Sequence, residues 1–185
     1  MLFRSKAACY EDAVQVFSGT GVQITCEGRR CLGSALGTAS FVENFVSAEV
    51  SAWLQEIHHL SEVATIHPHV AYAALTHGLA GRWIYLVRTT PGLASLLQPL
   101  EQALRCQLLP AITGRPSPGD AEWELLTLPT RFGGLGIPSP LLVCESEEAV
   151  SKAVTAPLVS RIVQQQLVLG SAIEEAGTAK AAAAS

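Results

Sequence analysis

The chain of 185 residues is poor in aspartate and in charge. It has two aspartates, Asp12 and Asp120, which lie more than a hundred residues apart. Two-metal phosphoryl transfer needs carboxylates clustered around ions that lie about 4 Å apart, so we expect no catalytic residues for that chemistry. Charged residues make up 15% of the chain and hydrophobic residues 49%. This composition predicts a packed globular protein, part of whose apolar exterior is covered by a partner.

Basic residues are missing from one long stretch. Residues 31–81 carry four glutamates and neither lysine nor arginine, and the whole chain has a net charge of −4. Nucleic-acid-binding proteins normally carry a basic patch, so a polyanion would have to contact the chain on either side of that stretch. The basic residues there that could reach a nucleic-acid backbone are Arg29, Arg30, Arg82, Arg88, Arg105, Arg115 and Arg131.

Signals for secretion and for membrane insertion are also lacking. The five cysteines are odd in number and show no short paired spacing, and no basic leader with an apolar stretch precedes them. We therefore expect an intracellular protein, in either the cytoplasm or the nucleus. The run 63–81 lacks charged residues over 19 positions, but it contains Pro68 and three histidines. This run predicts a buried helix, and no contact with a membrane.

Sites for metals and cofactors are not indicated. All five histidines fall between His58 and His77, but adjacent His58 and His59 would point about 100° apart on a helix, and no cysteine or aspartate joins them. The glycines of "SGTG" lack the lysine of a phosphate-binding loop. We expect no metal ligand and no cofactor, with a histidine zinc site as the less favoured alternative.

The first third of the chain predicts a helix, a hairpin and a long helix. "YEDAVQVF" indicates a short helix, and "VQIT", the turn "CEG" and "RRCLGSALG" indicate a β-hairpin that turns at 26–28. A capping box of Ser40 and Glu43 predicts the start of a helix of about 25 residues. Its apolar stripe comprises Val42, Val46, Val50, Trp53, Ile57, Leu60 and Ala64.

The remainder predicts further helices and one tight turn. Helices are expected over 68–88, 93–109 and 118–126, the last capped by Ser117, and two terminal helical pieces over 145–154 and 156–170. The ten residues "RFGGLGIPSP" at 131–140 predict a tight turn that presents Arg131. The expected fold is mainly α: a helical bundle with one small N-terminal β-hairpin and a Gly-rich turn near 131–138.

The order of motifs resembles that of a known family. "GTGVQIT-CEGRRCLGSALGT", "FVENFVSAEVSAW", "HPHVAYAALTHG", "LEQALRCQLLPAITGR" and "LPTRFGGLGIPSP" together resemble the region after the catalytic palm of reverse transcriptases from retrotransposons without long terminal repeats. The resemblance covers roughly residues 10–165. In that family a hairpin with an aromatic-Leu-Gly step supports the primer end, and thumb helices follow it. Leu32 and Gly33 match the Leu-Gly step, whereas Cys31 replaces the aromatic residue.

The resemblance implies a segmentation and a function. Residues 1–37 would be a palm remnant with a primer-grip-like hairpin, 38–110 a thumb-like bundle, 111–170 a connection with C-terminal helices, and 171–185 a disordered Ala-rich tail. The family's paired catalytic aspartates, which hold Mg²⁺, are absent here. The chain would thus be a fragment of an RNA-directed DNA polymerase that binds template and primer weakly and does not polymerise alone.

The resemblance also implies which residues and partners serve that function. The nucleic-acid-binding residues would be Arg29, Arg30, Leu32, Gly33, Arg115 and Arg131. The partners would be an RNA–DNA duplex, and a palm domain or another protein on the apolar helix face. The alternative is a helical protein-interaction or scaffold module that uses the valine and tryptophan stripe and has no role with nucleic acids.

Overall fold

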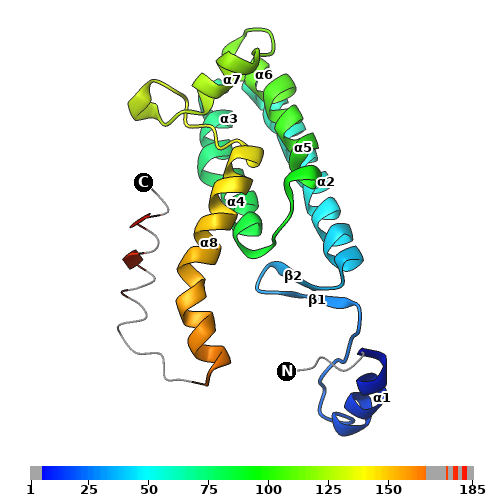
Figure 1. Cartoon of the computed structure of the whole chain (residues 1–185). Helices are drawn as coiled ribbons and strands as arrows, with labels where there is room; N and C mark the ends of the chain where they lie inside the picture. The colour runs from blue at the N-terminus through cyan, green and yellow to red at the C-terminus, as the bar shows by residue number, and fades with distance from the viewer. Residues whose placement is uncertain (1–5, 166–173, 175–176, 179–180, 183–185) are drawn as a thin grey trace. The chain divides into compact units, whose positions relative to one another are not determined.

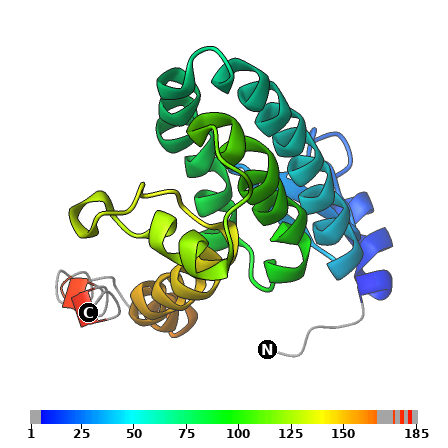
Figure 2. The same cartoon turned by 90° about the horizontal axis from the view of Figure 1, so that it is seen from above.

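The structure, a computed structural model, describes residues 6–165 together with 174, 177–178 and 181–182 (Figure 1 and Figure 2). It is mainly helical with one small antiparallel hairpin near the N-terminus, which confirms the expected fold class. The chain divides into two compact units, unit 1 (Met1–Glu49) and unit 2 (Val50–Ser185). The segmentation expected from the sequence stays a prediction, and most of the tail expected at 171–185 lies outside the described residues.

Unit 1 contains helix α1 (Lys6–Val16), strands β1 (Gly28–Cys31) and β2 (Ser34–Gly37), and the start of helix α2 (Ala39–Ala64). The expected hairpin turn at 26–28 is wrong, because the chain reverses at Leu32 and Gly33. Both residues have positive φ, 50° and 86°, the conformation of a two-residue turn whose twist matches that of the flanking strands. The segment 22–25, expected as a strand, is irregular.

The open end of the hairpin requires two glycines. Gly28 pairs with Gly37 across the strands. A Cβ on Gly37 would lie 2.3 Å from the carbonyl oxygen of Glu27, and one on Gly28 would lie 2.5 Å from the ring of Phe41. Only residues without a side chain fit this pair. The "CEG" segment, interpreted from sequence as the turn, instead leads into β1 at the pair formed by Gly28 and Gly37.

The N-terminus of α2 differs from the prediction in its cap. Thr38, not Ser40, is the capping residue: its hydroxyl oxygen accepts a hydrogen bond from the backbone N–H of Phe41 at 3.3 Å. The reason is that the N–H of Thr38 bonds to the carbonyl of Glu27, which holds Thr38 in the hairpin geometry, so the helix begins at the next residue. Ser40 and Glu43 are exposed on the first turns of α2.

The apolar stripe of α2 is buried as its spacing predicts. Within the stripe, Val46, Val50, Trp53, Ile57 and Ala64 are buried, and Val42 and Leu60 are half-buried. In unit 2 the ring of Trp53 packs edge-on against that of Trp83, with centroids 6.3 Å apart. The stripe is therefore an internal part of the core, and the apolar residues that a partner could cover lie elsewhere.

Unit 2 is built from α2 after residue 49 and two long helical runs. The first run comprises α3 (Pro68–Ala74), a π-helical segment η1 (Leu75–Leu79) and α4 (Ala80–Thr89). The second comprises α5 (Ala94–Ala103), a π-helical segment η2 (Leu104–Leu108) and α6 (Leu109–Thr113). The first run agrees with the range expected from the sequence, whereas the second continues beyond its expected end at residue 109 to Thr113. A core of leucines and Trp83 holds them together.

The last two helices of unit 2 differ from the prediction at their ends. Helix α7 (Asp120–Thr127) begins after Gly119 and not at Pro118. Pro118 is buried, and its carbonyl accepts a hydrogen bond from Arg105 Nε at 2.9 Å, so it anchors the approach to the helix. The expected pieces 145–154 and 156–170 are joined over their described helical part in a single helix, α8 (Pro140–Val163), which continues through Pro157. Residues 166–170 of the second piece lie outside the described residues. Helix α8 packs against α4 and α5 (Figure 1).

Polar contacts join α8 to the end of α4 and to the chain that follows it. Arg88 Nε donates to Glu147 at 2.7 Å, and this hydrogen bond raises the pKa of Arg88 above its ordinary value. Glu148 accepts from Lys152 and from the backbone N–H of Gly92, which lowers the pKa of its carboxyl. In Figure 2 the chain from α7 to α8, yellow-green to gold, runs along one side of unit 2.

Candidate nucleic-acid interface

The two arginines of the hairpin lie on opposite faces of β1, because successive side chains of a strand alternate. Arg30 pairs with buried Ala35, and its guanidinium lies 5.6 Å from the ring centroid of Phe45 and 3.9 Å from Glu49. Arg29 pairs with exposed Leu36 on the other face. The hairpin therefore presents positive charge on both of its faces.

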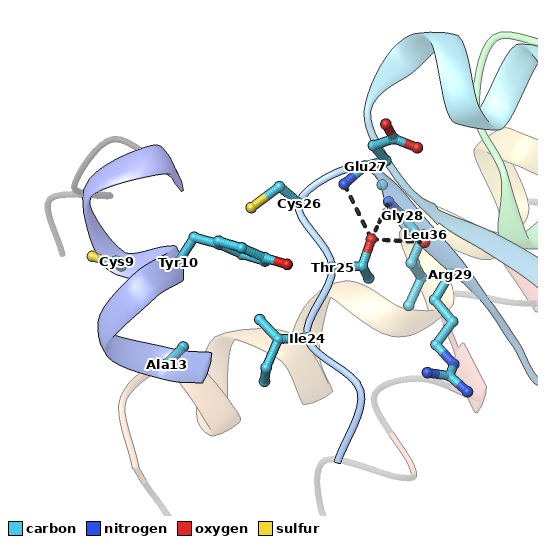
Figure 3. Close-up of a pocket in the computed structure, with 11 residues that line it drawn as sticks. Cys9, Tyr10, Ala13, Ile24, Thr25, Cys26, Glu27, Gly28, Arg29 and Leu36 are labelled. Atoms are coloured by element: carbon cyan, nitrogen blue, oxygen red, sulfur yellow. Dashed lines mark hydrogen bonds between the residues drawn. The ribbon is translucent and has the colours of Figure 1, made fainter. Parts of the chain in front are cut away.

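Arg29 borders a hollow of about 530 Å³ between α1 and the hairpin (Figure 3). Tyr10 points from α1 toward Ile24 and Cys26, whereas Arg29 extends away from α1 (Figure 3). The guanidinium of Arg29 donates to the side-chain oxygen of Gln23 at 2.6 Å. Arg29 is exposed and has no acidic partner among the described residues, so it can meet an anion without breaking an ion pair.

The tip of the hairpin carries an exposed apolar side chain. Leu32 is 90% exposed and has a φ of 50°, a conformation that costs a non-glycine residue about 1 kcal/mol. Gly33 follows with a φ of 86°. The structure thus brings Arg29, Arg30, Leu32 and Gly33 together on one hairpin.

Several arginines of unit 2 are already engaged within the protein. Arg82 bonds to Glu56 at 2.6 Å and Arg105 to Asp120 at 2.7 Å, in addition to the Arg88–Glu147 pair described above. Each of these pairs joins two different elements of unit 2. Contacts to a phosphate would have to compete with the carboxylate that each guanidinium already holds, which leaves these arginines poorly suited to binding nucleic acid.

Arg115 and Arg131 differ from the engaged arginines. Both are exposed, and within the described residues neither has an acidic partner. Arg131 lies with its guanidinium 4.8 Å from the ring centroid of Phe132, a side chain that is itself 61% exposed. Arg115 lies in the connection between α6 and α7. Both connections lie at the end of unit 2 where Figure 1 labels α6 and α7.

The Gly-rich stretch that carries Arg131 is the tight turn its composition predicts. A 3₁₀ turn, η3 (Thr130–Phe132), ends at Gly133 in the left-handed conformation. The chain then returns along α7, where the N–H of Leu135 bonds to Leu126 O at 2.9 Å and that of Gly136 to Leu128 O at 2.8 Å. The hydroxyl of Tyr72 donates to the carbonyl of Leu135. These bonds fix the turn and therefore the position of Arg131.

The carboxylate of Glu101 organises the segment after this turn, a role that no sequence pattern predicts. Its oxygens accept from Trp123 Nε1 at 2.7 Å and from the Ser139 hydroxyl at 2.8 and 2.9 Å. Ser139 in turn caps α8 by accepting from the N–H of Leu142. Glu101 thus ties α5 to α7 and α8. Trp123 and Ser139 lie 22 and 38 residues away from Glu101 in sequence, and no local sequence pattern indicates these contacts.

We expect Glu101→Gln to lower the free energy of unfolding by about 1 to 2 kcal/mol. The change replaces one carboxylate oxygen by an NH₂ group, which cannot accept the hydrogen bond that the oxygen accepted. Thermal unfolding followed by circular dichroism measures this loss. Glu124→Gln on α7 is the control, since Glu124 is exposed, and it should change stability little. Equal effects of the two changes would contradict the role assigned to Glu101.

The histidines do not gather around a common point. His58 Nε2 lies 3.7 Å from Glu62, and His58 and His59 lie side by side with ring centroids 6.1 Å apart. Within the part of the chain that the structure describes, no three histidine, cysteine or acidic side chains are grouped as a metal ion requires. Among the same residues, no helix has the length and apolar character needed to cross a membrane.

The chain was compared with models of protein families, with curated proteins and with solved structures, and no match was found in any of the three.

Proposed function

We propose that the chain is the thumb-like region of a retrotransposon reverse transcriptase and that it binds an RNA–DNA duplex weakly, without polymerising by itself. The proposal rests on the motif order described above and on the order of the structural elements. A two-residue hairpin with Leu32 and Gly33 at its tip leads directly into helix α2. A helical bundle that follows such a hairpin is the arrangement that the sequence resemblance implies.

The observation that carries the binding function is the division of the arginines into two groups. Arg82, Arg88 and Arg105 each hold a carboxylate at 2.7 Å or less. Arg29, Arg115 and Arg131 have no acidic partner among the described residues, and the Arg30–Glu49 contact is long at 3.9 Å. Guanidinium groups that are not held by carboxylates are available to phosphates. These four arginines are therefore the proposed contacts to the nucleic-acid backbone.

Binding to a labelled RNA–DNA duplex at low salt, followed by fluorescence anisotropy, tests this function. We expect the double change Arg30→Ala and Arg131→Ala to weaken binding about tenfold, through the loss of two exposed charge contacts. The control is Arg82→Ala with Arg88→Ala, which alters the net charge equally but removes guanidinium groups that already hold Glu56 and Glu147. Equal weakening by both pairs of changes would contradict the assignment of the contacts.

A protein-interaction module is the second candidate, and the exposed apolar side chains of unit 1 favour it. Tyr10, Val14, Val16 and Phe17 on or beside α1 are 40–73% exposed. This surface is open to a partner, whereas the valine and tryptophan stripe of α2 is buried. Absence of duplex binding, together with self-association that added salt does not change, would favour this candidate over nucleic-acid binding.

A further inference from the structure

A second hollow, of about 340 Å³, lies where the α6–α7 connection meets α7 and the chain that returns after the Gly-rich turn. Its volume is near the lower limit of the range of about 300–1,000 Å³ found for ligand pockets, which suits one ring system. The apolar side chains that line it are Leu109, Pro116, Pro118, Leu126 and Leu135. Bases that are taken out of a helical stack pack against side chains of this kind.

Two opposite charges also line this hollow, and they do not pair with each other. Arg115 and Glu122 both border it, yet neither side chain has an ion-pair partner among the described residues. Elsewhere in unit 2 arginines and acidic residues form pairs, as Arg82 does with Glu56. Because Arg115 and Glu122 border one apolar hollow and do not pair with each other, they leave room for a ligand that has both an anionic group and a hydrogen-bond donor.

The arginine is held at the border by its own backbone. Gly114 is in the left-handed conformation with a φ of 67°, and its N–H bonds to the carbonyl of Pro110. The hydroxyl of Thr113 donates to Leu109 O at 2.9 Å and accepts from the N–H of Arg115 at 3.3 Å. These bonds stop α6 and direct the chain toward the hollow at Arg115.

We propose that this hollow binds one unpaired nucleotide of a single-stranded segment that adjoins the duplex. The phosphate would meet Arg115, the base would lie on the apolar floor, and an amino group of the base would donate to Glu122. Cytosine, adenine and guanine carry such an amino group and thymine does not. This inference rests on the proposed function. It extends that function to a substrate that has a single-stranded part with a preferred base.

The test compares three labelled RNA–DNA duplexes: one with blunt ends, one with a short overhang of cytidines and one with a matching overhang of thymidines. We expect the whole chain to bind the cytidine overhang several-fold more tightly than the other two. Glu122→Gln should remove most of the difference between cytidine and thymidine, because the amide loses the charge that favours an amino donor. The same change should leave binding to the blunt duplex unchanged or slightly stronger, since a negative charge is lost.

Glu124→Gln is the matched control, because Glu124 is exposed on the same helix and does not line the hollow. It should preserve the preference for cytidine. If the blunt duplex binds and neither overhang changes the affinity, the nucleotide site is wrong while the proposed function stands. If no duplex binds at low salt, the proposed function fails and the nucleotide site fails with it. An equal response to Glu122→Gln and Glu124→Gln would also overturn the site.

Discussion

Trp53→Ala is expected to lower the free energy of unfolding by about 3 to 5 kcal/mol, the loss typical of a fully buried tryptophan. Trp53 is 2% exposed and packs edge-on against Trp83, which is 0% exposed. Truncation to alanine removes the indole and leaves a cavity beside Trp83 that the surrounding helices cannot fill completely. Urea unfolding monitored by circular dichroism measures the change.

Trp53→Phe separates packing from hydrogen bonding in this experiment. The indole Nε1 of Trp53 is buried and has no hydrogen-bond partner in the described structure, so phenylalanine gives up apolar contact without the loss of a hydrogen bond. Trp53→Phe should therefore lower the free energy of unfolding clearly less than Trp53→Ala does. A loss below 1 kcal/mol for Trp53→Ala would show that the stripe of α2 is not the centre of the core.

Gly134→Ala is expected to destabilise the protein by about 3 kcal/mol, the upper part of the range for overpacked positions. A Cβ at this position would lie 2.1 Å from the carbonyl oxygen of Leu128 and 2.7 Å from that of Leu125. Backbone atoms cannot move aside as a side chain can. The turn must therefore separate from α7 and lose the bonds from Leu135 and Gly136 to that helix.

Gly133→Ala is the comparison for this change. A Cβ on Gly133 would meet no atom within 4 Å, and only its φ of 85° disfavours a side chain. Gly133→Ala should lower the free energy of unfolding by about 1 kcal/mol. Thermal unfolding of the two variants measures the difference. Comparable costs at both positions would mean that the turn does not lie against α7 as described.

The helical content was predictable because it depends on patterns within one segment. The stripe from Val42 to Ala64 recurs at helical spacing, and amphipathic burial follows from that spacing alone. The ends of elements were less predictable. Thr38 displaces the capping box because the hairpin determines its backbone, and Pro118 lies outside α7 because Arg105 holds its carbonyl. Each of these depends on a contact that the local sequence does not contain.

The sequence was enough to predict that arginines would form the candidate site, but not which of them are available to bind a phosphate. The sequence offers many arginines, and nothing near Arg82 or Arg88 shows that a glutamate holds each of them across a distance of 26 or 59 residues. The charges at Arg115 and Glu122 could not be related to a hollow before Leu135 was known to return against α7. Tertiary contacts thus decide which basic residues remain available to a phosphate.

The salt dependence of duplex binding tests the central claim most directly. The logarithm of the binding constant falls with the logarithm of salt concentration by about 0.9 per neutralised phosphate of a B-form duplex. The account predicts a slope that becomes shallower by about 3 to 4 when Arg29, Arg30, Arg115 and Arg131 are all changed to alanine. It predicts little change when Arg82, Arg88 and Arg105 are replaced instead. An unaltered slope in the fourfold variant, or an equal reduction in both variants, would contradict it.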